Sequence, residues 1–294
     1  MLVKGLYTAI ITPFSGEEID WDGLESNIEF QIENGVDGLV ILGTTGETPT
    51  LTNSEKEEII TKSISIINNR VKVIIGTGTN NTKTTIENTQ MAEKYGADGA
   101  LIVTPYYNKP SQKGIYEHFK KIIENTDIPI IVYNIEGRTG RNIDVNTLIK
   151  ISELDNIVGV KEASGNINQM GDVINEISRL NPDFSVMSGD DGLTLPLMSM
   201  GGHGVISVVS NLVPAEMKSL VLYAEAGNFE KARNIHYRLL PLFKGAFIET
   251  NPQPIKCAMN LCNMAGGDLR LPLVDVSDET EEKLRVILES MEII

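Results

Sequence analysis

Eight short apolar segments recur along this chain, and their spacing constrains its fold more than any other feature. They follow one another about every 30 residues. Continuous apolar runs of this length are typical of parallel strands that are buried on both faces. We expect these strands at residues 7–12, 38–42, 71–75, 100–103, 128–132, 157–160, 184–187 and 204–208.

Helical patterns fill the intervals between the predicted strands. Leu24, Ile28 and Ile32 recur at four-residue spacing, which places them on one face of a helix. Thr52 is followed three residues later by Glu55, the pattern of a capping box at a helix N-terminus. Strands and helices that alternate eight times predict an α/β fold of the (β/α)8 TIM barrel type, with a doubly wound open sheet as the alternative.

The end of the chain shows only helical patterns. Pro214 stands where the first turn of a helix tolerates proline. We therefore expect a barrel at residues 1–212 and a C-terminal helical segment at residues 213–294 that packs on it. No stretch rich in Pro, Gly or Ser divides the two parts.

The composition excludes several classes of function. The net charge of −15 disfavours binding to nucleic acid, because a phosphate backbone would be repelled. No apolar run is long enough to span a membrane, and the N-terminus lacks the pattern of a secretory signal. With only Cys257 and Cys262, a disulfide framework is excluded and a reducing, cytoplasmic location fits. The three histidines are scattered, so we expect no metal site.

Catalytic groups in such barrels come from the C-terminal ends of the strands, and Lys161 stands at one of these ends. A buried ammonium is costly unless it is paired or deprotonated. Desolvation lowers the pKa of a lysine amine and yields the neutral nucleophile that attacks carbonyl groups. The alternative is an ordinary lysine in a solvated loop.

Hydroxyl groups and one guanidinium follow other strands. Thr44 and Thr45 lie between glycines after the second strand, where backbone amides can hold a carboxylate, although a tight turn with capping hydroxyls is the alternative. Tyr133 ends the fifth strand, and a phenol there can relay protons beside an imine. Arg138 can grip a carboxylate with two hydrogen bonds, or form a surface ion pair with Glu136.

Two further motifs have simpler explanations. Asp190 and Asp191 follow the seventh strand, and we interpret them as a helix N-cap and turn rather than a cation site. His203 precedes the eighth strand, so we expect a structural role at the far face of the barrel. The glycines around His203 raise the alternative of a flavin- or phosphate-binding barrel, but no basic residues accompany them.

Four motifs occur in order at these strand ends, and together they resemble the dihydrodipicolinate synthase branch of the N-acetylneuraminate lyase superfamily. The resemblance runs nearly end to end, from Ala9 to Lys256. The motifs are Gly43-Thr44-Thr45-Gly46-Glu47, Tyr106-Tyr107, Tyr133-Asn134-x-x-x-Arg138-Thr139 and Val160-Lys161-Glu162-Ala163.

The resemblance implies a Schiff-base mechanism without a metal or an organic cofactor. Lys161 would bind pyruvate covalently, and Tyr133 would donate and accept protons. Thr44 and Tyr107 would complete a proton relay, with Tyr107 reaching across a subunit contact. The family members are commonly homotetramers built as dimers of dimers.

The resemblance also implies how the two substrates are held. Thr45 and the backbone of Ile206 would hold the carboxylate of pyruvate, and Arg138 would hold that of aspartate semialdehyde. Gly189 and Asn251 are further candidates for substrate binding. The product would be 4-hydroxy-tetrahydrodipicolinate, the entry to lysine and diaminopimelate synthesis.

Regulation is expected to differ from that of lysine-inhibited relatives. Those proteins usually carry a histidine and a glutamate in an allosteric pocket at the subunit contact, where this chain has Lys56 and Thr84. Asn80 and Tyr106 match the family pattern. We therefore expect weak or absent feedback by lysine.

Alternatives remain within and beyond this superfamily. An aldolase or lyase that releases pyruvate from a sialic acid or a keto-deoxy sugar acid would keep Lys161 and Tyr133, but its pocket prefers a residue other than arginine at position 138. The family usually has proline where this chain has Glu136, which loosens the loop and brings a carboxylate near Arg138. A ligand-binding barrel without catalysis is the last alternative.

Overall fold

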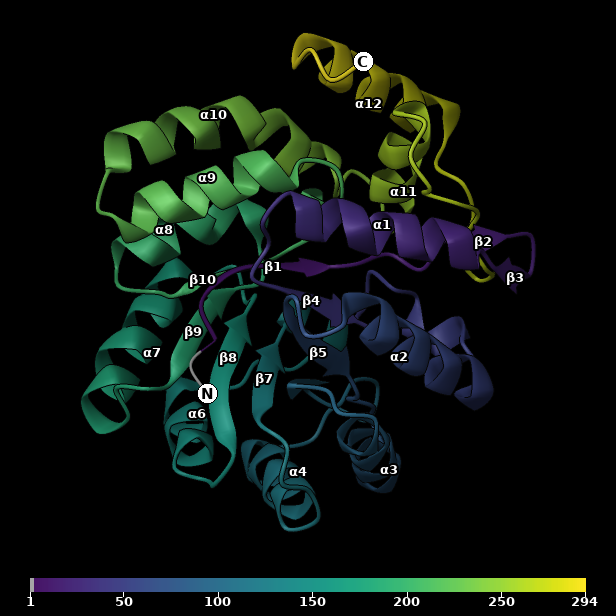
Figure 1. Ribbon diagram of the computed structural model, residues 1–294. Helices are drawn as coiled ribbons and strands as arrows, with labels where there is room; N and C mark the ends of the chain where they lie inside the picture. The colour runs from purple at the N-terminus through teal and green to yellow at the C-terminus, as the bar shows by residue number, and fades with distance from the viewer. Residues whose placement is uncertain (1–2) are drawn as a thin grey trace.

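The computed structural model describes residues 3–294, and its centre is a closed barrel of eight parallel strands (Figure 1). The TIM-barrel prediction is confirmed, and all eight predicted segments overlap the observed strands. The ring has no open edge, because the first barrel strand in the chain pairs with both the second and the eighth. In barrel order the strands are β1 (Gly5–Ala9), β10 (Gly204–Ser207), β9 (Ser185–Ser188), β8 (Ile157–Glu162), β7 (Ile130–Asn134), β6 (Gly99–Val103), β5 (Lys72–Gly76) and β4 (Gly38–Ile41).

Helices cover the outer face of the barrel, with a main helix after each strand (Figure 1). A small antiparallel ribbon, β2 (Phe14–Ser15) and β3 (Glu18–Ile19), was not predicted from the sequence. The main helices are α1 (Trp21–Glu33), α2 (Asn53–Ile67), α3 (Thr82–Lys94), α4 (Gln112–Ile123), α6 (Val145–Ser152), α7 (Ile167–Leu180), α8 (Thr194–Ser199) and α9 (Pro214–Glu225). Short turns are α5 (Glu136–Thr139), η1 (Thr48–Thr50), η2 (Asp191–Leu193) and η3 (Val209–Asn211).

Local sequence signals explain where several helices begin. The capping box predicted at Thr52 and Glu55 is present at the start of α2. The side chain of each residue accepts a hydrogen bond from the backbone N–H of the other. Pro214 occupies the first turn of α9, as predicted. Leu24 and Ile28 form part of the buried face of α1.

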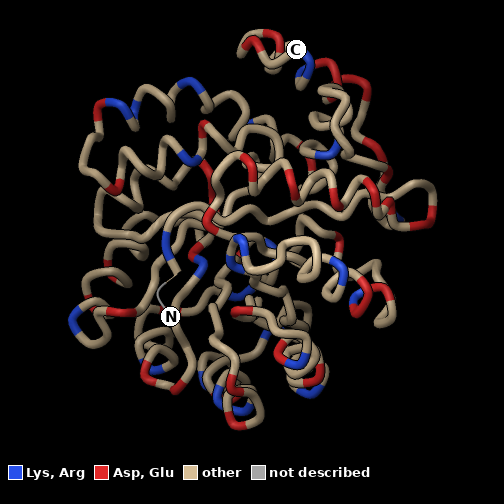
Figure 2. Tube along the Cα trace, viewed as in Figure 1, with Lys and Arg blue, Asp and Glu red and all other residues tan. Residues whose placement is uncertain are grey.

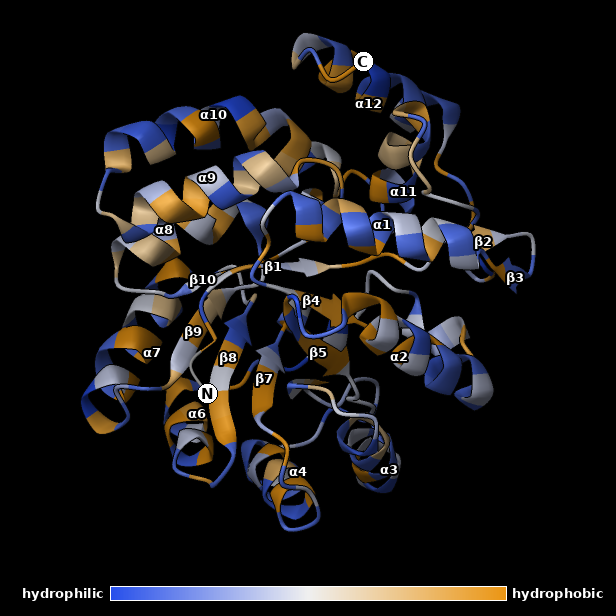
Figure 3. Cartoon of the chain, in the orientation of Figure 1, coloured by the Kyte–Doolittle hydropathy of each residue, from blue (hydrophilic) through white to orange (hydrophobic). Residues whose placement is uncertain are grey.

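Side chains that alternate along the strands divide the interior into two cores. Ile131 and Tyr133 of β7 belong to the core within the bore, whereas Val132 belongs to the layer between the strands and the helices. Val160 of β8 likewise packs in the outer layer, so Lys161 faces the bore. Figure 3 shows the apolar positions of the outer helices turned toward the strands, and polar positions on their solvent side.

The C-terminal helices complete one side of the molecule. α9 contacts β1 and so takes the place of the eighth barrel helix, while α10 (Phe229–Gly245) lies outside it (Figure 1). α11 (Gln253–Leu261) and α12 (Asp278–Ser290) pack together near the C-terminus. The boundary between barrel and helical segment at residue 212 stays a prediction.

Charged groups lie mostly on the outer helices and loops (Figure 2), where water solvates them. Among residues 3–294, no helix combines the length and the apolar character that crossing a membrane requires.

One ion pair is an exception, because it is fully buried. Lys256 of α11 donates to Glu47 across 2.5 Å between Nζ and Oε1, with the two side chains 1% and 0% exposed. Lys256 also donates to the carbonyl of Asp268, and the backbone N–H of Arg270 donates to the second carboxylate oxygen of Glu47. The pair therefore ties the C-terminal segment to the loop that follows β4.

We expect Lys256→Met to lower the free energy of unfolding by about 3–5 kcal/mol, because it leaves the carboxylate of Glu47 buried without a cation. Urea denaturation followed by circular dichroism measures the loss. Lys283→Met is the matched control, since it breaks an exposed ion pair with Glu279. The urea concentration at the midpoint of its unfolding should stay close to that of the wild type. A loss below about 1 kcal/mol for Lys256→Met would contradict the role of this pair.

Candidate active site

A cavity of about 290 Å³ opens at the C-terminal ends of the barrel strands. Its walls come from the ends of β1 and of β4 to β8, from segments that follow β4 to β7, β9 and β10, and from the stretch between α10 and α11. Seven of the residues predicted for catalysis or substrate binding line it: Thr44, Thr45, Tyr133, Arg138, Lys161, Gly189 and Asn251.

Lys161 lies within β8 rather than after it, and its side chain is only 5% exposed. The alternative of a lysine in a solvated loop is therefore wrong. Burial lowers its pKa from 10.5 to about 8; the charge of Asp191 opposes this shift and that of Arg138 adds to it. At neutral pH the ammonium form still predominates, but the neutral, nucleophilic fraction of this amine is far larger than in an exposed lysine with a pKa of 10.5.

Gly189 leaves the space that the lysine side chain occupies. A Cβ atom at this position would lie 3.0 Å from Cε of Lys161 and 2.7 Å from Cβ of Ala163. A larger residue directly after β9 would therefore clash with Ala163 and force the lysine stem to give way by a few tenths of an ångström. The structure thus places Gly189 against the nucleophile.

Tyr133 stands beside the lysine on the neighbouring strand. The two residues are register partners between β7 and β8, and Nζ of Lys161 lies 4.6 Å from the centroid of the Tyr133 ring. Burial raises the pKa of Tyr133 to about 12, while the charge of Arg138 and the nearby hydroxyl of Thr44 act in the opposite direction. The phenol is therefore protonated at neutral pH, and Thr44 lines the same cavity.

Asn251 joins the two residues predicted to hold carboxylates. Its Nδ2 donates to Oγ1 of buried Thr45 at 3.0 Å, and its backbone carbonyl accepts from Nη2 of Arg138 at 3.1 Å. Because an amide nitrogen only donates, the hydroxyl hydrogen of Thr45 stays available for a ligand. Within residues 3–294 no ion pair joins Glu136 to Arg138, although the two share the short helix α5.

The two neighbouring aspartates play different parts. Asp190 accepts from the backbone N–H of Gly192, so the N-cap prediction is confirmed for this residue. Asp191 is buried instead, and one of its oxygens accepts from the backbone N–H groups of Val208 and Val209. Burial raises the pKa of Asp191, and its charge acts on Lys161. The sequence pattern carried no signal for this difference, which depends on contacts with the segment after β10.

The other predicted residues differ in where they lie relative to this cavity. Tyr107 is 90% exposed with a φ of 69°, so its role as a relay group from another subunit stays a prediction. Ile206 is buried in the bore core.

The four residues predicted for an allosteric pocket do not all lie together. Tyr106 and Lys56 line the cavity, whereas Asn80 and Thr84 do not. The backbone carbonyl of Asn80 accepts a hydrogen bond from Asn108, and Thr84 lies in α3. Weak lysine feedback stays a prediction.

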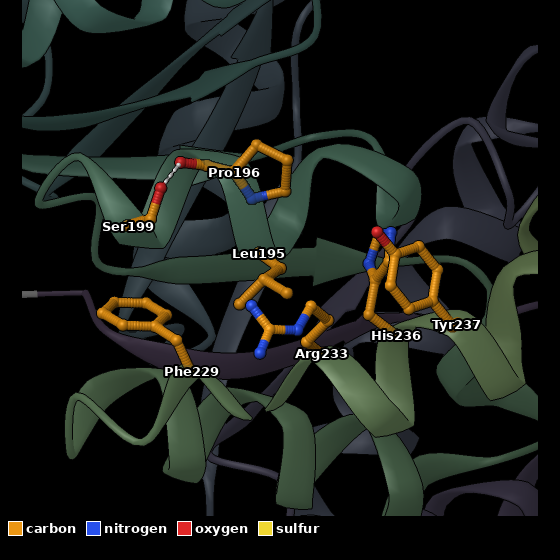
Figure 4. Close-up of a pocket in the computed structure, with 7 residues that line it drawn as sticks. All are labelled: Leu195, Pro196, Ser199, Phe229, Arg233, His236 and Tyr237. Carbon is orange, nitrogen blue, oxygen red and sulfur yellow. Dashed lines mark hydrogen bonds between the residues drawn. The ribbon is translucent and has the colours of Figure 1, made fainter. Parts of the chain in front are cut away.

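A second hollow lies between α8 and α10, away from the lysine. Figure 4 shows Arg233, His236 and Tyr237 of α10 facing the short helix α8. None of the residues predicted for catalysis or substrate binding lines it. In the part of the chain that the structure describes, no group of three or more His, Cys, Asp or Glu is placed to hold a metal ion.

Comparisons with known proteins agree with this arrangement. A model of the dihydrodipicolinate synthetase family matches residues 2–291. The 4-hydroxy-tetrahydrodipicolinate synthase of Protochlamydia amoebophila is 54% identical over 99% of this chain and 97% of its own.

Solved structures resemble the whole fold. The dihydrodipicolinate synthase of Thermotoga maritima is 45% identical, with a TM-score of 0.98 and coverage of 100% of both chains. A dihydrodipicolinate synthase variant described as monomeric is 45% identical, with a TM-score of 0.97 over 99% of this chain and 97% of that one. The family model covers nearly the whole of this chain, and the lysine, tyrosine and arginine of the sequence motifs lie together in one cavity. This chain therefore belongs to the dihydrodipicolinate synthetase family.

Proposed function

We propose that this protein condenses pyruvate with L-aspartate 4-semialdehyde to give 4-hydroxy-tetrahydrodipicolinate, the first committed step of lysine and diaminopimelate synthesis. The observation that carries the proposal is the buried amine of Lys161, with its pKa lowered to about 8, beside Tyr133 in a cavity that also contains Arg138. The named relatives support the same reaction.

The first half of the reaction forms a nucleophile from pyruvate. Nζ of Lys161 adds to the keto carbon, and loss of water gives an imine. The imine withdraws electrons, so a methyl proton leaves and an enamine forms. Tyr133 moves these protons, supported by Thr44 and by Tyr107 of a second subunit. Thr45 donates to the pyruvate carboxylate next to the backbone of Ile206.

The second half joins the two substrates. The enamine carbon bonds to the aldehyde carbon of the semialdehyde, and the aldehyde oxygen takes a proton to become a hydroxyl group. The substrate's amino group then adds to the imine carbon and displaces Lys161, which closes the ring. One water is released over the whole cycle, and Arg138 holds the semialdehyde carboxylate with Asn251 and Gly189 at the pocket wall.

A lyase for sialic or keto-deoxy sugar acids is the second candidate for this site. It would use Lys161 and Tyr133 in the same way but would not need the guanidinium of Arg138.

Every step of the proposed condensation uses protein groups alone, so the proposed enzyme requires no metal or organic cofactor.

Assembly and location are part of the same proposal. We infer a homotetramer built as a dimer of dimers, in which the exposed Tyr107 of one subunit enters the cavity of another. A positive φ at Tyr107, where side chains are rarely tolerated, fits a residue that its surroundings in an assembly hold in place. We infer that the enzyme works in the cytoplasm.

Treatment with pyruvate and borohydride tests the mechanism directly. We expect a stable adduct on the peptide that contains Lys161, located by mass spectrometry, and none in Lys161→Ala. Lys256 is an internal control, because it is a second buried lysine but pairs with Glu47 outside the cavity. An adduct elsewhere, or turnover that survives Lys161→Ala, would remove the basis of the proposal.

Asp191 should shift the pH dependence of imine formation. Its negative charge raises the pKa of Lys161, so Asp191→Asn should lower that pKa and supply neutral amine at lower pH. The rate of pyruvate trapping should therefore begin to rise at a lower pH than in the wild type. In Asp190→Asn, the matched control, the rate should rise at the same pH as in the wild type. A shift to higher pH in Asp191→Asn contradicts this electrostatic assignment.

Replacing Arg138 should separate the two substrates. We expect Arg138→Met to raise the KM for aspartate semialdehyde about tenfold or more, through loss of a charge-assisted hydrogen bond, while pyruvate is still trapped. Arg141→Met, on the same loop, is the matched control. Equal KM values in the Arg138 variant and the wild type would favour the sugar-acid alternative.

A further inference from the structure

A buried carboxylate lies directly behind the nucleophilic lysine. Glu162 follows Lys161 as the last residue of β8, and its side chain is 0% exposed. Because neighbouring residues of a strand point to opposite faces, Glu162 faces the helix layer while Lys161 faces the bore. Asn134 pairs with Glu162 in the same register in which Tyr133 pairs with Lys161.

Only uncharged donors surround this carboxylate. Its Oε1 accepts from the backbone N–H of Ser164 at 2.8 Å, and its Oε2 accepts from Nδ2 of Asn134 at 3.0 Å and from Nε2 of Gln169 at 3.3 Å. Among residues 3–294, no lysine, arginine or histidine forms an ion pair with Glu162. Burial of a carboxylate without a cation is costly, so its presence at this position calls for a reason.

The network continues to the loop that follows Arg138. Nδ2 of Asn134 also donates to Oδ1 of Asn142 at 2.8 Å, and Oδ1 of Asn134 accepts from the backbone N–H of Ile143 at 3.0 Å. Nδ2 of Asn142 donates to Oε1 of Gln169 at 2.8 Å. Residues 142 and 143 come shortly after α5, the short helix that carries Arg138.

A carboxylate has a property here that an amide lacks, because it accepts hydrogen bonds and never donates them. Asn134 must therefore turn its nitrogen toward Glu162, which leaves its oxygen for Ile143. Gln169 must do the same, which leaves its oxygen for Asn142. One acidic group thus fixes the orientation of the amides that connect β7, β8 and the Arg138 loop.

We propose that Glu162 is a positioning residue that holds Lys161 and Tyr133 in register and, through Asn134 and Asn142, holds the loop that carries Arg138. This inference rests on the proposed function, since it assigns Glu162 a part in the geometry of that reaction. It acts from outside the barrel wall and touches no substrate.

Glu162→Gln is the primary test, because it replaces one accepting oxygen with an NH₂ group. That group cannot accept the hydrogen bonds that neighbouring donors now make to the carboxylate. We expect the rate of pyruvate trapping by cyanoborohydride to fall about tenfold and the KM for aspartate semialdehyde to rise about tenfold. Asn142→Ala loosens the loop alone, so it should raise this KM with a smaller effect on trapping. The double variant Asn134→Asp with Glu162→Gln restores a donor facing an acceptor between the two strands, and should recover part of the trapping rate.

Gln31→Leu is the matched control, because it breaks a buried network between β1 and η3, away from β8. Per folded molecule, it should change neither the trapping rate nor the KM. Wild-type trapping and an unchanged KM in Glu162→Gln would overturn the inference. If that variant fails to fold, an unchanged KM in Asn142→Ala overturns it. A wild-type protein that forms no pyruvate adduct would instead refute the proposed function.

Discussion

The burial of one amine governs the chemistry of this structure. Lys161 lies in the bore of the barrel, where water cannot solvate its ammonium form, and its pKa falls to about 8. The charge of Asp191 favours the ammonium form, and the charge of Arg138, whose effect is smaller, disfavours it. In the mechanism that we propose, such an amine is neutral often enough to attack a carbonyl and can still take up protons during the reaction.

Two kinds of contact keep this amine in place. Alternation along β7 and β8 turns Tyr133 and Lys161 into the bore and Asn134 and Glu162 into the outer layer, so both faces of the strand ends are fixed. On the other side of the cavity, the buried pair of Glu47 with Lys256 anchors the loop that carries Thr44 and Thr45. The C-terminal segment is therefore joined to the catalytic end of the barrel.

Much of the fold was predictable from the sequence, because strands buried on both faces leave continuous apolar runs. The capping box at Thr52 and the proline at the start of α9 were equally local signals. The ribbon of β2 and β3 was not predictable, because strands of two residues carry no periodicity.

The candidate site was predictable where a motif ends a strand, as with Tyr133 and Lys161. It was not predictable where long-range contacts decide, as with the burial of Asp191 or the pairing of Glu47 with Lys256, which are 209 residues apart in sequence. Tyr107 needs a second subunit for its proposed role, and a single chain cannot supply it.

The most direct test of the account is an NMR titration of Lys161 in protein carrying ¹⁵N-labelled lysine side chains, with Lys161→Ala used to assign the signal. The account predicts a midpoint near pH 8 for this amine. A midpoint near 10.5, the ordinary value for an exposed lysine, would contradict it.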